Sequence, residues 1–176
     1  AAGEAGGLRF VGSEGDHYDL DSQIEISAQE GFTIFATIDR TTHSANQTLL
    51  GLNNNDHFLE FATGGNNIKI KLGGATTTIS PGDGSQVDFA SGEKFLFTLV
   101  RESGSTGNIN VYKNGTLLAQ DSQVANANDG EFISVGVRNA NRFLHGLLYD
   151  LAFYEKQLDA SELANAHAYL TGYHGL

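Results

Sequence analysis

The sequence has no cysteine, which excludes disulfide bonds, thiol catalysis and thiolate metal sites together. Tryptophan is also absent, which weakens the case for a cleft that stacks sugar rings, although Tyr18, Tyr149 and Tyr154 can supply aromatic faces. Only ten Lys and Arg stand against 21 Asp and Glu, for a net charge of −11. Because nucleic acids and anionic membranes attract basic patches, this balance argues against both as partners. Membrane insertion is not expected either, since no apolar run approaches the ~20 residues that cross a bilayer.

The composition that is present favours an all-β protein. The 176 residues are 40% hydrophobic, with 22 glycines, 11 phenylalanines and one proline. This balance suits many short strands joined by tight turns around one core. The first ten residues have neither the basic start nor the apolar segment of a signal peptide. We therefore expect residues 1–176 to form a single monomeric module cut from a larger extracellular protein. An acidic domain without cysteine also suggests a secreted or cell-surface setting in bacteria, because small secreted animal domains often depend on disulfides.

Apolar residues alternate with period two along most of the chain, which predicts β-strands. Twelve such stretches in one core predict two packed antiparallel sheets. The turn signals are physical, because Asn114-Gly115, Gly64-Gly65 and Gly73-Gly74 tolerate the positive φ angles of tight hairpins. The polar stretch 80–93 is expected to carry the chain from one sheet to the other. The predicted strands are 9–11, 17–21, 23–27, 31–40, 47–52, 57–62, 67–72, 75–80, 93–102, 108–119, 131–137 and 146–155.

One short helix is predicted near the C-terminus, in the stretch "LDASELANAHAYL". Asp159 and Glu162 have the spacing of a reciprocal capping box at its start. Leu163, Ala166 and Leu170 then lie on one face. We expect this helix to pack as a lid on the sandwich.

The order of several stretches resembles the laminin-G-like branch of the concanavalin A-like sandwiches, which includes the pentraxins. The stretches are "LRFVGSEGDHYDL", "GFTIFATI", "LLGLNNNDHFLEF", "FTLVRESGSTGNINVYKNGTLL" and "SVGVRNANRFLHGLLYDLAFYEKQLDASEL". The resemblance covers nearly the whole chain and implies a two-sheet jelly roll. It also implies binding of sugars, peptides or proteins, often through calcium at one rim, whereas a minority of such sandwiches cleave glycans.

The asparagine-rich stretch within "LLGLNNNDHFLEF" is the first candidate site. In the pentraxin-like pattern, the corresponding hairpin brings an Asp/Asn pair to a calcium site, and Asn55 and Asp56 fall at that place. Ca²⁺ prefers six to eight oxygen ligands, and Asn53 and Asn54 add further oxygens. The alternative is that Asn and Asp stand here only because they tolerate turn geometry.

A second loop departs from the family pattern. The resemblance implies an acidic calcium loop after "SVGV", yet the sequence reads "RNANRFLHG". Arg138 and Arg142 stand where carboxylates are expected, and only Asn139, Asn141 and backbone oxygens are left as ligands. The two guanidinium groups suit a carboxylate of a ligand. The alternative is that they neutralise neighbouring acids.

Asp150 is the third candidate for the metal. The resemblance implies that an aspartate on the last strand can hold a structural calcium ion, with help from Asp16 or Asp19. A buried aspartate that accepts backbone N–H bonds is the alternative.

Catalytic carboxylate pairs are not found in the arrangement that glycan cleavage needs. The nearest candidates are Asp19 with Asp21, and Asp150 with Glu155. Retaining cleavage places two carboxylates ~5 Å apart on one face, whereas strand parity sends Asp150 and Glu155 to opposite faces.

The sequence therefore predicts a non-catalytic, calcium-dependent adhesion module. It is expected to recognise a glycan or a carboxylate-bearing peptide on a host or cell surface, at one rim of the sandwich. The alternatives are a glucanase or lyase type of enzyme, its accessory carbohydrate-binding module, and a structural spacer. We expect Asp56→Ala and Arg138→Ala each to weaken ligand binding at least about tenfold with little change in Tm.

Overall fold

The computed structural model describes most of the chain. The described residues are 6–41, 45–52, 54–63, 67–74, 76–80, 89, 92–104, 107–121 and 128–176.

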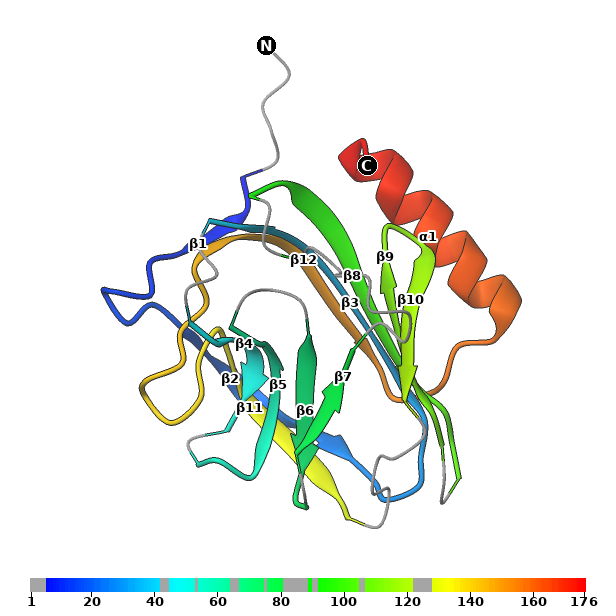
Figure 1. Cartoon of the computed structure of the whole chain (residues 1–176), viewed down its shortest axis with the longest axis horizontal. Coiled ribbons are helices and arrows are strands. Elements are labelled where there is room, and N and C mark those ends of the chain that lie inside the picture. The colour runs from blue at the N-terminus through cyan, green and yellow to red at the C-terminus, as the bar shows by residue number, and fades with distance from the viewer. Residues whose placement is uncertain are drawn as a thin grey trace.

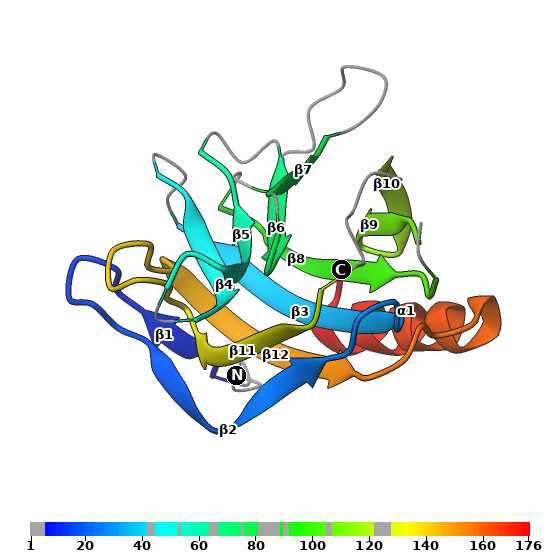
Figure 2. The same ribbon diagram turned by 90° about the horizontal axis from the view of Figure 1, so that it is seen from below.

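In these residues, twelve strands form two six-stranded sheets that face each other (Figures 1 and 2). Every strand pairing is antiparallel. Sheet A has the order β1 (Leu8–Phe10), β12 (Gly146–Tyr154), β3 (Phe32–Arg40), β8 (Lys94–Arg101), β9 (Ile109–Lys113), β10 (Thr116–Asp121). Sheet B has the order β2 (Tyr18–Ile26), β11 (Gly130–Val135), β4 (Gln47–Gly51), β5 (His57–Phe61), β6 (Ile68–Leu72), β7 (Thr77–Ile79). This architecture confirms the predicted two-sheet jelly-roll sandwich.

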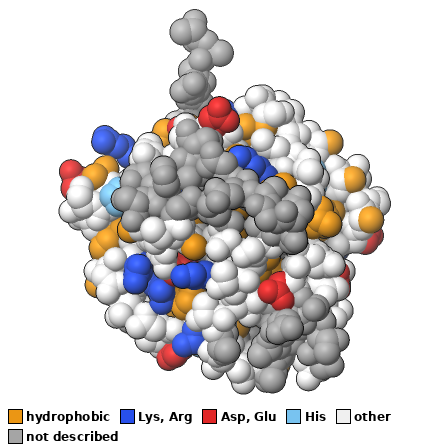
Figure 3. All heavy atoms as spheres, viewed as in Figure 1, with side chains coloured by type: hydrophobic (Ala, Val, Ile, Leu, Met, Phe, Trp, Pro, Cys, Tyr) orange, Lys and Arg blue, Asp and Glu red, His pale blue; other side chains and the backbone are white. Residues whose placement is uncertain are grey.

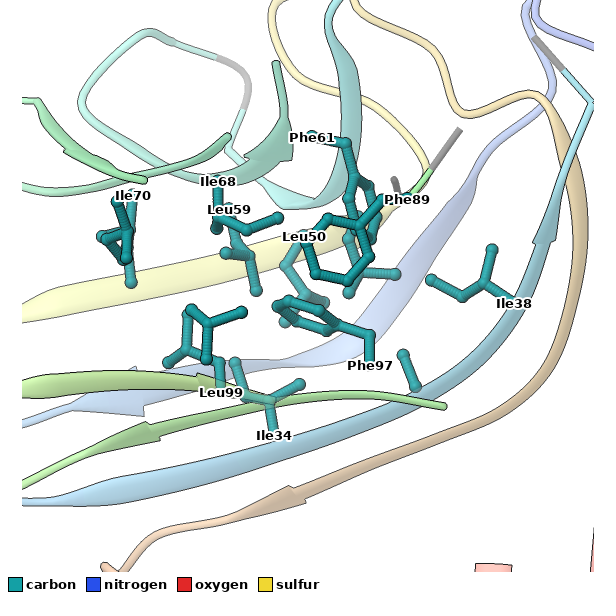
Figure 4. Packing of buried hydrophobic residues seen from close by; sticks show 14 of the residues in the cluster. Ile34, Ile38, Leu50, Leu59, Phe61, Ile68, Ile70, Phe89, Phe97 and Leu99 are labelled. Atoms are coloured by element: carbon teal, nitrogen blue, oxygen red, sulfur yellow. The ribbon is translucent and has the colours of Figure 1, made fainter. Parts of the chain in front are cut away.

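The core lies between the sheets because alternate residues of each strand point inward. Sheet A contributes Ile34 and Ile38 from β3 and Phe97 and Leu99 from β8, and all four are fully buried. Their labelled neighbours in Figure 4 are Phe89 and residues from the inner face of sheet B, including Phe61 of β5. The period-two pattern of the sequence is therefore the pattern of the core.

Helix α1 (Ala160–His174) covers the outer face of sheet A, as the sequence predicted (Figures 1 and 2). Its Asp159 cap accepts the backbone N–H of Glu162, whose side chain in turn accepts the N–H of Asp159. Phe35 and Leu96, which point outward from sheet A, pack against the apolar side of the helix. Among the described residues, no helix is both long and apolar enough to cross a membrane.

The number of strands agrees with the prediction, but two of the predicted divisions are wrong. The stretches 17–21 and 23–27 form one strand, β2, whose register with β11 shifts between Phe132 and Ser134. The stretch 108–119 forms two strands, β9 and β10. The hairpin between them has positive φ at Asn114 and Gly115, as predicted.

The other predicted turns are described only in part. Gly73 has a positive φ, whereas Gly64-Gly65 lies outside the described residues. Most of the stretch 80–93 also lies outside them. Because β7 belongs to sheet B and β8 to sheet A, the chain does change sheets in that interval.

Candidate functional site

The outer face of sheet B carries a charged residue that is buried. On β5, Leu59 and Phe61 point into the core, so Phe58 and Glu60 face outward. Both outward residues are nevertheless almost inaccessible, with Phe58 3% and Glu60 1% exposed. A carboxylate at this depth requires a partner.

Arg138 is that partner. Its Nε lies 2.8 Å from Glu60 Oε2 and its Nη2 2.9 Å from Glu60 Oε1, so the guanidinium donates to both oxygens of one carboxylate. Its Nη1 donates to Asn55 Oδ1 at 2.8 Å. The guanidinium also lies over the ring of Phe58, with its carbon 3.8 Å from the ring centroid. Asn46 donates a further hydrogen bond to Glu60 Oε1 at 3.0 Å. Glu60 is therefore fully paired although its side chain is inaccessible to solvent.

The β11–β12 loop, residues 136–145, reaches this position because β4 lets it approach closely. A Cβ atom on Gly51 would lie 2.2 Å from the Val137 carbonyl oxygen, so only glycine fits there. Ser134 Oγ donates to the same carbonyl at 2.9 Å. Asn139 N–H bonds the carbonyl of Leu52. The loop thus lies against the β4–β5 connection, as Figure 1 shows.

Polar side chains of the β4–β5 connection bond within the connection and to the neighbouring strand β6. Asn54 Oδ1 accepts the backbone N–H of Asp56 at 2.8 Å. The exposed carboxylate of Asp56 lies 3.4 Å from Lys71 Nζ. Asn53 lies outside the described residues. The contact between Asn55 and Arg138 brings the two predicted loops together at one rim.

Positive charge gathers next to this rim. Lys69 and Lys71 of β6 pair in register with Glu60 and Phe58, so all four side chains lie on the outer face of sheet B. Figure 3 shows Lys and Arg side chains gathered over β5 and the neighbouring loop. We call Lys69, Lys71 and Arg138 the basic patch. It holds three of the ten Lys and Arg of a chain with a net charge of −11.

The remaining loop residues are open to solvent. Asn139 and Asn141 are exposed, and Arg142 is half-buried. Within the part of the chain that the structure describes, neither Arg142 nor Lys69 has a hydrogen-bond or ion-pair partner. These side chains are therefore available to a ligand.

The sequence interpretation of Arg138 needs correction. Arg138 was expected to meet a ligand carboxylate, but its guanidinium already binds Glu60 and Asn55. The alternative, in which the arginine neutralises a neighbouring acid, holds for this residue. Sequence reasoning missed Glu60 and the two lysines of β6. The alternation in "HFLEF" and "IKIKL" was the available signal, because it places Phe58, Glu60, Lys69 and Lys71 on the outward face.

The rim does not fit a calcium ion. The side-chain oxygens of Asn54, Asn55 and Glu60, and Oδ1 of Asp56, are each directed at an N–H donor of the protein. Among the described residues, no group of three or more His, Asp or Glu has a geometry that could hold a metal ion. Calcium binding remains a prediction from the sequence.

Asp150, the other predicted metal ligand, lies at a separate groove. The groove has a volume of about 450 Å³ and lies between the edge of sheet A at β1 and β12 and the edge of sheet B at β2. Asp19 and Asp21 line it together with Asp150, beside the rings of Tyr18 and Tyr149.

The partners of these aspartates differ from the predicted ones. Asp150 is half-buried and contacts Nε2 of His174 on α1 rather than backbone amides. Asp16, which was expected to assist Asp150, instead accepts the N–H of Val11. Only Asp19 of the two predicted helpers shares the groove with Asp150.

Comparison with known proteins agrees with this architecture. The family model Laminin_G_3, of the concanavalin A-like lectin/glucanases superfamily, matches residues 12–164. No curated protein matches the sequence.

Several solved structures are similar in fold. The heptameric SAP-like pentraxin of Limulus polyphemus has a TM-score of 0.61 at 13% identity, over 86% of this chain and 80% of the pentraxin. The CBM40 module of the Ruminococcus gnavus IT-sialidase has a TM-score of 0.57 at 17% identity, over 87% and 98%. A botulinum neurotoxin type C structure, described as interacting with two ganglioside molecules, has a TM-score of 0.55 at 14% identity, over 88% of this chain and 45% of the toxin chain. At these identities the likeness concerns the fold alone.

Proposed function

Because the chain belongs to the concanavalin A-like lectin/glucanases superfamily, we propose that it is a non-catalytic ligand-binding module of a bacterial surface adhesin. It recognises an anionic ligand, either an acidic glycan or a carboxylate-bearing peptide, at the rim of sheet B. The observation that carries this proposal is that Lys69 of the basic patch and Arg142 of the β11–β12 loop have no acidic partner among the described residues of an otherwise acidic molecule.

The charge distribution selects the ligand. A chain with a net charge of −11 repels anions over most of its surface, so a local group of cations defines where an anion can bind. Lys69 and Arg142 have free donors, and the exposed amides of Asn139 and Asn141 add hydrogen bonds of the kind that sugar hydroxyls accept. Arg138 acts indirectly, because it holds the two loops together.

The superfamily also supports this reading. Two of the similar structures are a CBM40 module and a botulinum neurotoxin type C that is described as interacting with gangliosides. A sandwich whose outer face carries polar groups on rigid strands suits the same type of recognition.

The groove supports a second candidate, a carbohydrate-active enzyme or its accessory module. Asp19, Asp21 and Asp150 are three carboxylates beside two tyrosines, which is the composition of many sugar-cleaving sites. Turnover of a polysaccharide that is lost in Asp19→Asn or Asp150→Asn would favour this candidate.

The test is a screen of acidic and neutral glycans and of peptides, followed by titration of the best ligand. The double variant Lys69→Ala with Arg142→Ala is expected to bind at least about tenfold more weakly, or about 1.4 kcal/mol. Affinity is also expected to fall with salt, because exposed charges are screened. Lys156→Ala is the matched control, since Lys156 is exposed and pairs with Glu162 beside α1. Unchanged affinity in the double variant would show that the ligand binds elsewhere than at Lys69 and Arg142.

A further inference from the structure

The guanidinium of Arg138 occupies a cage of oxygens. Three oxygens from two segments of the chain converge on it within 2.9 Å, namely both carboxylate oxygens of Glu60 and Oδ1 of Asn55. The side chain of Glu60 is 0% exposed and that of Arg138 only 11%. Such a convergence of buried oxygens on one centre is the arrangement by which proteins hold hard cations.

We propose that Arg138 is the permanent cation of this rim, in the place a divalent metal ion would take. A carboxylate, an amide oxygen and a neighbouring aspartate are oxygen ligands that Ca²⁺ prefers. With Arg138 present, both oxygens of Glu60 and Oδ1 of Asn55 face its nitrogen donors, and Oδ1 of Asp56 faces Lys71. A metal ion would therefore meet electrostatic repulsion and find few free oxygens. The rim is therefore assembled without calcium.

Other contacts fix the guanidinium in place. The ring of Phe58 lies against one face of it, and this contact favours a planar cation over a hydrated metal ion. Asn46 donates to Glu60 Oε1, which orients the carboxylate. Lys71 neutralises Asp56, the other carboxylate of the rim. Each acidic group of the rim thus has a cation from the chain itself.

This inference deepens the proposed function. If the rim needs no calcium, ligand binding should persist in a chelator, and this consequence rests on the proposed function. Its test uses calcium alone, so it does not depend on finding a ligand. A failure of the ligand screen leaves the calcium measurements interpretable, and a failure of the calcium measurements leaves the ligand screen interpretable.

The experiment compares thermal unfolding in millimolar calcium and in chelator for the native protein, Arg138→Gln and Arg142→Gln. Arg138→Gln removes the cation and frees the oxygens of Glu60 and Asn55, so calcium is expected to raise its Tm by at least about 3 °C more than that of the native protein. Arg142→Gln, in the same loop but outside the cage, is expected to behave as the native protein does. Equal calcium responses in the native protein and Arg138→Gln, including no response in either, would overturn the proposal.

A second comparison decides the question if Arg138→Gln does not fold under either condition. The native protein and Asp56→Ala are titrated with calcium. The Asp56 carboxylate lies at the rim and is 59% exposed, so its removal is expected to cost little stability. The proposal requires the same calcium response in both. A calcium-dependent rise in Tm that is present in the native protein and absent in Asp56→Ala would show that the rim holds the ion, and Arg138 would not be its substitute.

Discussion

Nε2 of His167 on helix α1 lies 3.1 Å from Oγ1 of Thr98 on β8, beneath the helix. The imidazole is 8% exposed and lies between the rings of Phe35 and Tyr112. This contact joins the helix to the outer face of sheet A. It also introduces a titratable group into an otherwise apolar interface.

The first prediction is that the protein loses stability as the pH falls below about 6.5. Burial lowers the pKa of His167 from its ordinary value of 6.5, so the unfolded chain binds a proton in a range where the folded chain does not. Stability from this group is therefore complete above the ordinary pKa and declines as the pH falls toward the lowered one. In His167→Gln the loss of Tm between neutral pH and about pH 5 is expected to be smaller than in the native protein. An equal loss in both would assign the acid sensitivity to other groups.

The second prediction replaces one made from the sequence. Arg138→Ala was expected to leave Tm nearly unchanged, but the structure pairs Arg138 with a carboxylate that is 0% exposed. Removing one partner of a buried ion pair costs about 3–5 kcal/mol. The free energy of unfolding of Arg138→Ala, measured by urea denaturation, should fall by that amount. The double variant Arg138→Gln with Glu60→Gln should be more stable than Arg138→Gln alone, because it no longer buries an unpaired carboxylate. A loss below about 1 kcal/mol, as for an exposed pair, would contradict the burial.

The third prediction concerns Arg101 at the end of β8. The residue is 0% exposed, and none of its three guanidinium nitrogens has a hydrogen-bond partner within the described residues. Burial lowers the pKa of Arg101 for this reason. Within the described part of the chain, the guanidinium has a cation–π contact with the ring of Phe32, whose centroid is 5.7 Å away, and no ion-pair partner. Arg101→Met is therefore expected to stabilise the fold by about 1–4 kcal/mol. Denaturant unfolding measures this, and a less stable Arg101→Met would mean that the charge is compensated.

The fourth prediction is that Gly172→Ala stabilises helix α1. A Cβ at this helical position meets no atom within 4 Å, so the substitution adds no clash. Alanine in a helix interior is favoured over glycine by about 0.5–1 kcal/mol. Gly51→Ala is the opposite case and should unfold readily, because its Cβ would lie 2.2 Å from a carbonyl oxygen. Tm measurements on the two variants should therefore shift in opposite directions.

The fold could be predicted largely because its signals are local. Period-two alternation located the strands, and the spacing of Asp159 and Glu162 located the start of α1. The points at which one strand ends and the next begins were less predictable. The shift of register between Phe132 and Ser134 is set by pairing with β2, which is distant in the sequence, so the sequence did not show that 17–21 and 23–27 form one strand.

The candidate site was predictable only in outline. Family topology placed the asparagine-rich hairpin near the loop of Arg138, and the hydrogen bond from Arg138 to Asn55 agrees with that placement. The partner of Arg138 was not foreseen. Glu60 is 78 positions away, and whether it meets Arg138 depends on how the loop lies over β5. A glutamate in a strand carries no sequence signal that distinguishes a buried outward position from an exposed one.

The alternation along β6 divides its side chains between the core and the outer face of sheet B. Ile68, Ile70 and Leu72 are buried in the core, whereas Lys69 and Lys71 between them point to the outer face. A substitution at either lysine changes the charge of the outer face of sheet B and leaves every core side chain of β6 in place. The outward charge of β6 and its inward packing can therefore be varied independently, because exchange of Lys69 and Lys71 leaves Ile68, Ile70 and Leu72 in the core.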